Sequence, residues 1–150
     1  MKKVILGCDH AGLALAEFIQ DFLSTNQTTL TFCKPPTGER VDYPDYAKEV
    51  CNKLLISPAP QDVYGILVCG SGIGMSIACN KISGVRAALC TDAYMAKMAR
   101  LHNNANVLCL GQNVVGFGVA QSIVEAFLQT GFEGGRHAIR VEKLERMNTC

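Results

Sequence analysis

Five short runs of β-branched and other apolar residues alternate along the chain with segments of helical periodicity. The runs span residues 3–7, 29–33, 65–69, 86–90 and 106–110. Between the first two, Leu15, Ile19 and Phe22 recur at the spacing of one helix face. This alternation predicts an α/β fold, a Rossmann-like doubly wound parallel sheet of five strands in a three-layer α/β/α sandwich. With 150 residues, 49% of them hydrophobic, we expect residues 1–150 to form a single domain.

Two further segments carry apolar residues at helical spacing and are predicted to bury them in the core. They are Tyr94, Met98 and Leu101, and Val119, Ile123 and Phe127. Residues 34–44 and 57–61 contain several prolines and are predicted to be loops. After residue 135 the sequence becomes charged and helical. We expect residues 136–147 to form a C-terminal helix that packs on a partner subunit.

Polar groups suited to chemistry follow the ends of the predicted strands. Asp9 and His10 come after the first run, and residues 69–74 come after the third. In an open parallel sheet, ligands bind outside the carboxyl ends of the strands, where the strand order reverses. Our hypothesis is a strand order of 2-1-3-4-5, which places these two turns across one crevice.

The third run leads into a turn that combines a thiol with glycines. Its residues are Cys69, Gly70, Ser71, Gly72, Ile73 and Gly74. Glycines let the backbone approach a ligand closely, and successive amides form an anion-binding nest. The turn lacks the dinucleotide fingerprint, since Met75 replaces its third glycine, and no Lys-Ser or Lys-Thr pair follows as in a phosphate loop. A tight strand-to-helix turn with an inert buried cysteine is the structural alternative.

Composition restricts the partners and the compartment. The net charge is +1 with scattered Lys and Arg, so we expect a small-molecule partner, no nucleic acid and no membrane. The apolar N-terminal run is too short for a signal peptide, which predicts a cytoplasmic protein. Most of the eight cysteines lie in or just after apolar runs and no Cys-x-x-Cys pair exists, so we expect reduced thiols and no metal site.

Ten polar residues at predicted strand ends, helix ends and loops supply acids, bases and fixed cations. They are Asp9, His10, Tyr43, Cys69, Ser71, His102, Asn103, Arg136, His137 and Arg140. Several have a structural alternative. Asp9 is suited to capping a helix, Tyr43 to packing before Pro44, and His102 to the negative end of a helix dipole.

Arg136 and Arg140 stand four residues apart, so a helix places both guanidinium groups on one face. Paired arginines suit a phosphate dianion, which they bind through bidentate hydrogen bonds. Solvated surface arginines are the structural alternative.

Seven short motifs, in order, cover nearly the whole chain. They are G-C-D-H-A-G at 7–12, E-R-V-D-Y-P-D-Y-A at 39–47, C-G-S-G-I-G at 69–74, N-K at 80–81, G-V-R-A at 84–87, H-N-N-A-N-V at 102–107 and E-G-G-R-H-x-x-R-V at 133–141. Together they resemble the ribose-5-phosphate isomerase B family, which has sister isomerases for galactose 6-phosphate and allose 6-phosphate. The resemblance implies interconversion of D-ribose 5-phosphate and D-ribulose 5-phosphate, a step of the pentose phosphate pathway, through an enediolate and without a metal or organic cofactor.

The resemblance also implies a role for each matching residue. Cys69 matches the catalytic base, His102 the residue that opens the sugar ring, and Ser71 a position for a proton shuttle between substrate oxygens. The remaining matches bind substrate: the enediolate at Gly70, Ser71, Gly72, Ile73 and Gly74, the sugar at Asp9, His10, Tyr43 and Asn103, and the phosphate at Arg136 and Arg140. A homodimer or dimer of dimers with shared active sites is implied as well.

Two departures from the family pattern stand out. One branch uses a glutamate after the glycine turn as its base, and Met75 at that position places this chain with the cysteine branch. Lys34-Pro35-Pro36 replaces a more common Asp-x-Gly turn. Two alternatives stay open: an isomerase of a hexose 6-phosphate of the allose or galactose type, and a non-catalytic sugar-phosphate-binding module.

Overall fold

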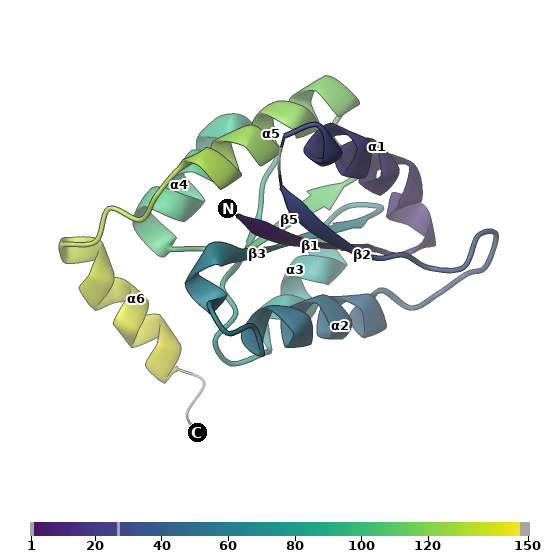
Figure 1. The fold of residues 1–150 in the computed structure, drawn as a ribbon. Helices are drawn as coiled ribbons and strands as arrows, with labels where there is room; N and C mark the ends of the chain where they lie inside the picture. Colours follow the sequence, from purple (N-terminus) through teal and green to yellow (C-terminus); the bar gives the residue numbers. More distant parts are fainter. Residues whose placement is uncertain (1, 27, 148–150) are drawn as a thin grey trace.

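The computed structural model describes residues 2–26 and 28–147, and its centre is a parallel sheet (Figure 1). The five strands are β1 (Lys3–Cys8), β2 (Thr29–Cys33), β3 (Val63–Cys69), β4 (Ala87–Leu89) and β5 (Val107–Gly111). All four strand pairs are parallel, and the register of the central pair sets Lys3 opposite Val63 and Cys8 opposite Val68. The predicted parallel sheet of five strands is confirmed.

The order of the strands differs from our hypothesis at one edge. The sheet runs β2-β1-β3-β5-β4, so the expected 2-1-3-4-5 order is wrong. Strand β5 is fully buried beside β3, whereas β4 has only three half-buried residues and lies at the edge. The Asn80 side chain covers that edge, because its amide donates to the Ala87 carbonyl and accepts from the Ala87 N–H, both at 2.9 Å.

Helices cover both faces of the sheet (Figure 1). Helices α1 (Leu13–Ser24), α4 (Ala93–Asn103) and α5 (Phe117–Gln129) lie on one face, and α2 (Tyr43–Leu55) and α3 (Ile73–Asn80) lie on the other. Two short 3₁₀ turns, His10–Gly12 and Pro60–Asp62, precede α1 and β3. Each layer has its own cluster of buried side chains against the sheet, which confirms the three-layer sandwich.

The stripe that we predicted for α4 is wrong, because Met98 and Leu101 are only half-buried and Tyr94 is exposed, and the stripe predicted for α5 is wrong at its first position. Tyr94 is 71% exposed and Val119 is 46% exposed. Helix α4 instead turns the small residues Ala96 and Ala99 inward, which lets it pack closely on α5. The Asp92 side chain caps α4 by accepting from the Met95 N–H at 2.8 Å, and this start sets which face is buried.

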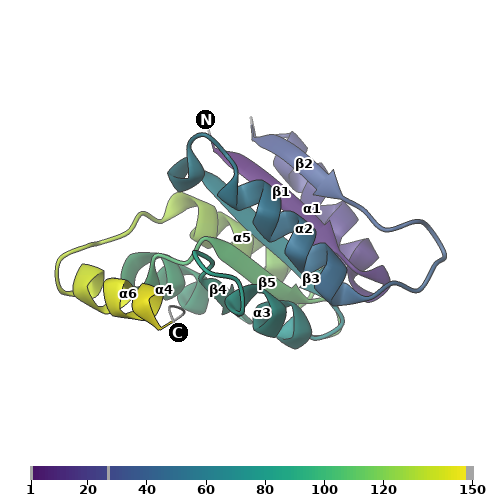
Figure 2. The same ribbon diagram turned by 90° about the horizontal axis from the view of Figure 1, so that it is seen from below.

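Helix α6 (Arg136–Arg146) stands apart from the three layers, next to α4 (Figures 1 and 2). An ion pair between Arg86, just before β4, and Glu145 ties it to the main body. The predicted C-terminal helix is therefore present, and its packing on a partner subunit stays a prediction. Among the described residues, no helix combines the length and the apolar character needed to cross a membrane.

A substitution at Gly12 tests how tightly the ends of β1 and β3 pack. A Cβ atom there would lie 2.4 Å from the Val68 carbonyl oxygen, which is backbone and cannot rotate away. We expect Gly12→Ala to lower the free energy of unfolding by about 3 kcal/mol, as overpacking does. Gly118→Ala is the control, because that helical position is open, and it should add about 0.5–1 kcal/mol. Denaturant unfolding measures both, and equal stabilities would contradict the tight contact.

Candidate active site

The turns that follow β1 and β3 lie side by side, as we predicted. The Asp9 N–H donates to the Val68 carbonyl at 3.3 Å, which continues the pairing of the two strands beyond their ends. Asp9 is buried, and its Oδ1 accepts from the N–H groups of Ala11 and Gly12 at 3.0 and 3.1 Å. The carboxylate therefore caps the 3₁₀ turn and is held beside the glycine-rich turn of the next strand.

The glycine-rich turn folds back on the Cys69 sulfur. Cys69 ends β3 with 5% of its surface exposed, and its Sγ accepts the Gly72 N–H at 3.1 Å. Gly72 has φ +77°, and a Cβ there would lie 2.6 Å from the Leu89 side chain, so the turn requires glycine. The turn leads directly into α3, whose N-terminal amides lack partners within the helix. An N–H donor and a helix N-terminus both stabilise negative charge on the sulfur.

Two amides of this turn already have partners. The Gly72 N–H is bonded to the Cys69 sulfur, and the Ile73 N–H donates to Ser71 Oγ at 3.3 Å. The Ser71 side chain is exposed at the mouth of the turn. A substrate oxygen bound here would share these donors with the thiol and the hydroxyl, in addition to the N–H groups of the first turn of α3.

Two more of the predicted residues surround the same turn. The Tyr43 ring lies over Gly74, where a Cβ atom would come within 2.7 Å of the Tyr43 Cζ. His10 Nδ1 accepts from the Val41 N–H at 3.1 Å, which holds the loop before α2 against the end of β1. The structure therefore brings together Asp9, His10, Tyr43 and the turn from Cys69 to Gly74.

Residues after β5 support the turn, and sequence reasoning missed them. The Gln112 N–H donates to the Cys69 carbonyl at 2.9 Å, and the Asn113 N–H donates to the Gly70 carbonyl at 3.0 Å. Gln112 Oε1 also accepts from the Leu15 N–H at 3.0 Å. Gln112 and Asn113 come directly after an apolar run in the sequence. This position could have identified them, because the ends of neighbouring parallel strands meet at one edge of the sheet.

The remaining predicted residues lie at the opposite end of the sheet. Helix α4 starts after the carboxyl end of β4 and runs back, so His102 and Asn103 reach the amino end of β5. Arg136 and Arg140 lie on α6, next to that end of α4 (Figure 2). Nine residues of helix from Ala93 to His102 span about 14 Å. Within one chain, the structure does not bring His102, Asn103 and the two arginines to the Cys69 turn.

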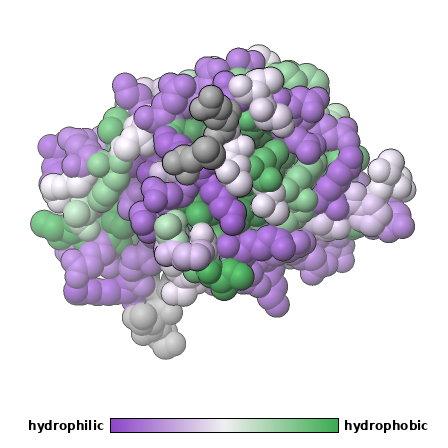
Figure 3. All heavy atoms as spheres, viewed as in Figure 1, coloured by the Kyte–Doolittle hydropathy of each residue, from purple (hydrophilic) through white to green (hydrophobic). Residues whose placement is uncertain are grey.

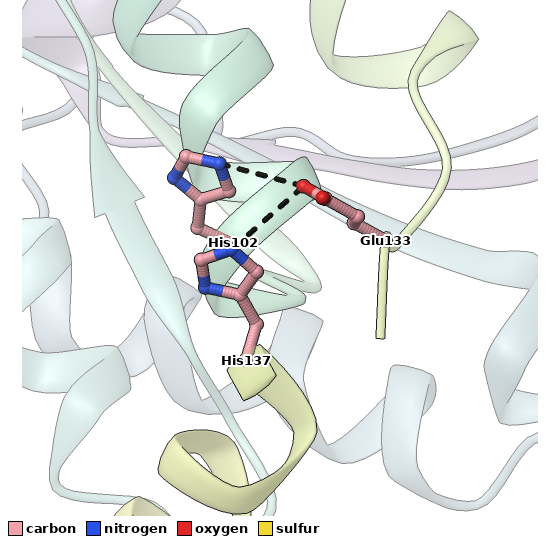
Figure 4. A group of neighbouring side chains, drawn as sticks. All are labelled: His102, Glu133 and His137. Atoms are coloured by element: carbon pink, nitrogen blue, oxygen red, sulfur yellow. Dashed lines mark ion pairs between the residues drawn. The ribbon is translucent and has the colours of Figure 1, made fainter. Parts of the chain in front are cut away.

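At this end, Glu133 approaches two stacked histidines from one side (Figure 4). Glu133 Oε2 is 3.6 Å from His102 Nε2 and 3.7 Å from His137 Nε2, and the two imidazole rings stack with centroids 4.1 Å apart. Burial is the main cause that lowers the pKa of His137, with the charges of His102 and Arg136 acting in the same direction and Glu133 opposing. These three side chains are also the described group that could ligate a metal ion.

Arg136 and Arg140 are exposed, and the acids around them have other partners. Glu133 faces the histidines, Glu142 pairs with Arg146, and Glu145 pairs with Arg86. Among the residues that the structure describes, neither Arg136 nor Arg140 has an ion pair. Two guanidinium groups on one helix face without a carboxylate are suited to binding an external anion.

Comparisons with known proteins agree on one family. The model of the Ribose/Galactose Isomerase family matches residues 4–144. Ribose-5-phosphate isomerase B of Escherichia coli is 43% identical over 96% of this chain and 95% of its own length. D-erythrulose-4-phosphate isomerase of Pectobacterium atrosepticum is 41% identical over 96% and 93%. The solved structure of Clostridium thermocellum ribose-5-phosphate isomerase B has a TM-score of 0.92 at 42% identity and covers 98% of this chain and 97% of that one.

Selective alkylation tests whether the turn activates the Cys69 thiol. Burial raises the pKa of Cys8, Cys33 and Cys90 to about 12, so these thiols stay protonated at mildly alkaline pH. In a Cys150→Ser variant, we expect iodoacetamide to modify Cys69 at least about tenfold faster than Cys8 at the neighbouring strand end. Peptide mapping by mass spectrometry measures both, and comparable rates would contradict activation by the turn.

Proposed function

Because the chain belongs to the ribose/galactose isomerase family, we propose that it interconverts D-ribose 5-phosphate and D-ribulose 5-phosphate. The bond from the Gly72 N–H to the Cys69 sulfur carries the proposal, since it places a thiol among backbone donors at the end of β3. The similarity to two ribose-5-phosphate isomerases B, one by sequence and one by structure, supports a phosphorylated pentose as the substrate.

The difficult step is the removal of a carbon-bound proton next to the substrate carbonyl. In our proposal the Cys69 thiolate takes the proton from C2 of the aldose and returns it to C1. Negative charge then develops on the substrate oxygens, and amides of the turn and of the first turn of α3 donate to them. Loss of one such donor typically costs on the order of 3 kcal/mol of transition-state stabilisation. Ser71 carries the remaining proton between the two oxygens.

Ring opening requires a proton to move from the anomeric hydroxyl to the ring oxygen. An imidazole can both accept and donate a proton, and we assign this task to His102. The Glu133 carboxylate lies 3.6 Å from the Nε2 of His102 and orients this imidazole ring toward it. Asp9, His10, Tyr43 and Asn103 hold the sugar hydroxyls, and Arg136 and Arg140 bind the phosphate, far from the reacting carbons.

A second copy of the chain brings the two groups of residues together in this proposal. We propose a homodimer, or a dimer of dimers, in which the Cys69 turn of one subunit meets His102 and α6 of another. Helix α6 supports it, because Ile139 and Leu144 are exposed there, and apolar atoms are visible on that side of the molecule (Figure 3). Two exposed apolar side chains on a helix that also carries two unpaired arginines are suited to a protein interface with a charged rim.

The relative that acts on D-erythrulose 4-phosphate supports one variation of the substrate, a shorter sugar phosphate. A hexose 6-phosphate of the allose or galactose type would be a longer substrate than the pentose phosphate. In each case the Cys69 turn performs the same proton transfer, and only the depth of the sugar pocket differs. A substrate comparison therefore belongs in the first assay.

Turnover of ribose 5-phosphate by the purified protein, with a chelator present, tests the proposed reaction. We expect ribulose 5-phosphate to form, and Cys69→Ala to lower kcat by at least about 100-fold, because that variant lacks the base. Erythrulose 4-phosphate and allose 6-phosphate, assayed alongside, should give lower kcat/KM. Faster turnover of either would reassign the substrate. Binding of ribose 5-phosphate with no turnover of any of the three would support the binding-module alternative.

Heterodimers of complementary variants test whether the active sites are shared. A Cys69→Ala subunit paired with a His102→Asn subunit should regain about half of the wild-type activity, since one of two sites is intact. The reciprocal control pairs a wild-type subunit with a Cys69→Ala/His102→Asn double variant and should be inactive. Two affinity tags isolate each heterodimer for assay. The reverse pattern, an active control with an inactive test dimer, would place the whole site within one chain.

A further inference from the structure

Three potential metal ligands converge at the junction of α4 and α6. His102 comes from the last turn of α4, Glu133 from the connecting segment and His137 from the first turn of α6 (Figure 4). Their ligand atoms all lie within 4.8 Å of one another. His137 is 5% exposed, and its Nε2 is buried without a hydrogen-bond partner among the described residues. A buried nitrogen without a hydrogen-bond partner, 3.7 Å from a carboxylate oxygen and stacked against a second imidazole, calls for a ligand.

Backbone hydrogen bonds hold the three side chains in place. The Glu133 N–H donates to the Leu101 carbonyl at 3.1 Å, which fixes Glu133 beside the residue preceding His102. Gly134 and Gly135 then turn the chain with φ of +71° and +55°, and the His137 N–H donates to the Gly134 carbonyl at 3.0 Å as α6 begins. The backbone positions of the three ligands are therefore set before any ion arrives, and only the His102 ring has to turn, which limits the entropic cost of binding.

We infer that His102, Glu133 and His137 form a binding site for Zn²⁺, completed by water. Zinc binds imidazole nitrogen and carboxylate oxygen at about 2.0–2.2 Å, so its tetrahedral ligands lie about 3.3–3.5 Å apart. Glu133 Oε2 is 3.6 and 3.7 Å from the two Nε2 atoms, so shifts of a few tenths of an ångström bring the carboxylate to ligand spacing from each imidazole, whereas the two imidazoles reach a shared ion only when one ring turns. Two imidazoles and one carboxylate match the donor preference of this ion.

Two features limit the affinity of this site. The imidazole rings are nearly parallel, at 11°, and a metal must lie close to the plane of each ring, so one ring has to turn. His102 is the ring that turns, because it is only half-buried, whereas His137 is packed in place. Arg136 and Arg140 stand nearby and repel a cation, and Glu133 alone offsets them. The site is therefore weaker than a closed structural zinc site and binds reversibly.

The consequence for activity rests on the proposed function. A Zn²⁺ ion that takes the Nε2 lone pair of His102 removes the group that we assign to ring opening. Zinc then acts as a reversible inhibitor of turnover from the cyclic sugar. The isomerase chemistry at Cys69 needs no metal, so the ion is an inhibitory ligand and not a cofactor.

Titration with Zn²⁺ and Co²⁺ tests the site independently of activity. By calorimetry of the full chain with reduced thiols, we expect one Zn²⁺ per subunit. Glu133→Gln, which keeps the shape of the side chain, should weaken binding by about 100-fold, at the upper end of losses seen for outer-shell partners. Glu142→Gln, an exposed carboxylate on α6, is the matched control and should bind as the wild type. Equal affinities for Glu133→Gln and wild type would overturn the assignment.

The Co²⁺ spectrum identifies the ligand atoms, since the eight cysteines offer a competing site. Nitrogen and oxygen ligation gives visible d–d bands without a sulfur-to-cobalt charge-transfer band, and that is the result expected. A charge-transfer band would place the ion on thiolates and overturn the proposal.

Inhibition is measured separately. The concentration of Zn²⁺ that halves turnover should match the dissociation constant and rise about 100-fold in Glu133→Gln. Binding at this site without inhibition would contradict the role of His102 and leave the metal site standing.

Discussion

The pairing of β1 with β3 at the centre of the sheet is the constraint on which the candidate site depends. The two strands are parallel and in register from Lys3 opposite Val63 to Cys8 opposite Val68, so both end at the same edge. Gly12 lets the turn after β1 contact the last peptide of β3 directly, where a side chain would collide with the Val68 carbonyl. Asp9 and Cys69 are therefore held side by side by backbone contacts, and their separation does not depend on flexible side chains.

The position of Cys69 at this edge of the sheet gives its thiol a different environment from those of the other buried cysteines. Cys51 and Cys79 lie between helices and the sheet, 3.5 Å apart, and their mutual hydrogen bond, together with burial, raises the pKa of Cys51. Cys69 is equally buried, yet it ends a strand where the chain turns into α3 and receives the Gly72 N–H. Burial disfavours a thiolate, and a backbone donor at a helix N-terminus favours it. Position at the strand end, more than burial, distinguishes this cysteine.

The sequence was sufficient to predict the strands and helices. It was insufficient to predict the order of all strands in the sheet and which helix faces are buried. Strand β2 was predicted with its observed bounds, because its β-branched run is flanked by polar residues. The strand order failed at β4 and β5, because β5 pairs with both β3 and β4, and no local pattern reveals which of two consecutive strands lies at the edge. Tyr94 was placed in the core because periodicity reports spacing and not which face is buried. Glu133 was noted only as part of a motif, because its contacts with His102 and His137 depend on the fold: its N–H donates to the Leu101 carbonyl, and the chain then turns at Gly134 and Gly135.

Helix α6 carries two arginines, Arg136 and Arg140, that no carboxylate of the described residues neutralises. Every carboxylate near Arg136 and Arg140 has another partner, so this helix carries two uncompensated cations next to a buried, neutral-favouring histidine. Glu142 and Glu145 lie two and five residues after Arg140, spacings at which side chains of a helix do not face each other, so the sequence of this helix leaves both arginines unpaired. Leaving them open is consistent with an anion that arrives from outside the chain. In the proposed chemistry, that anion and the thiol at the far edge of the sheet meet across two copies of the chain, so we expect activity to require assembly.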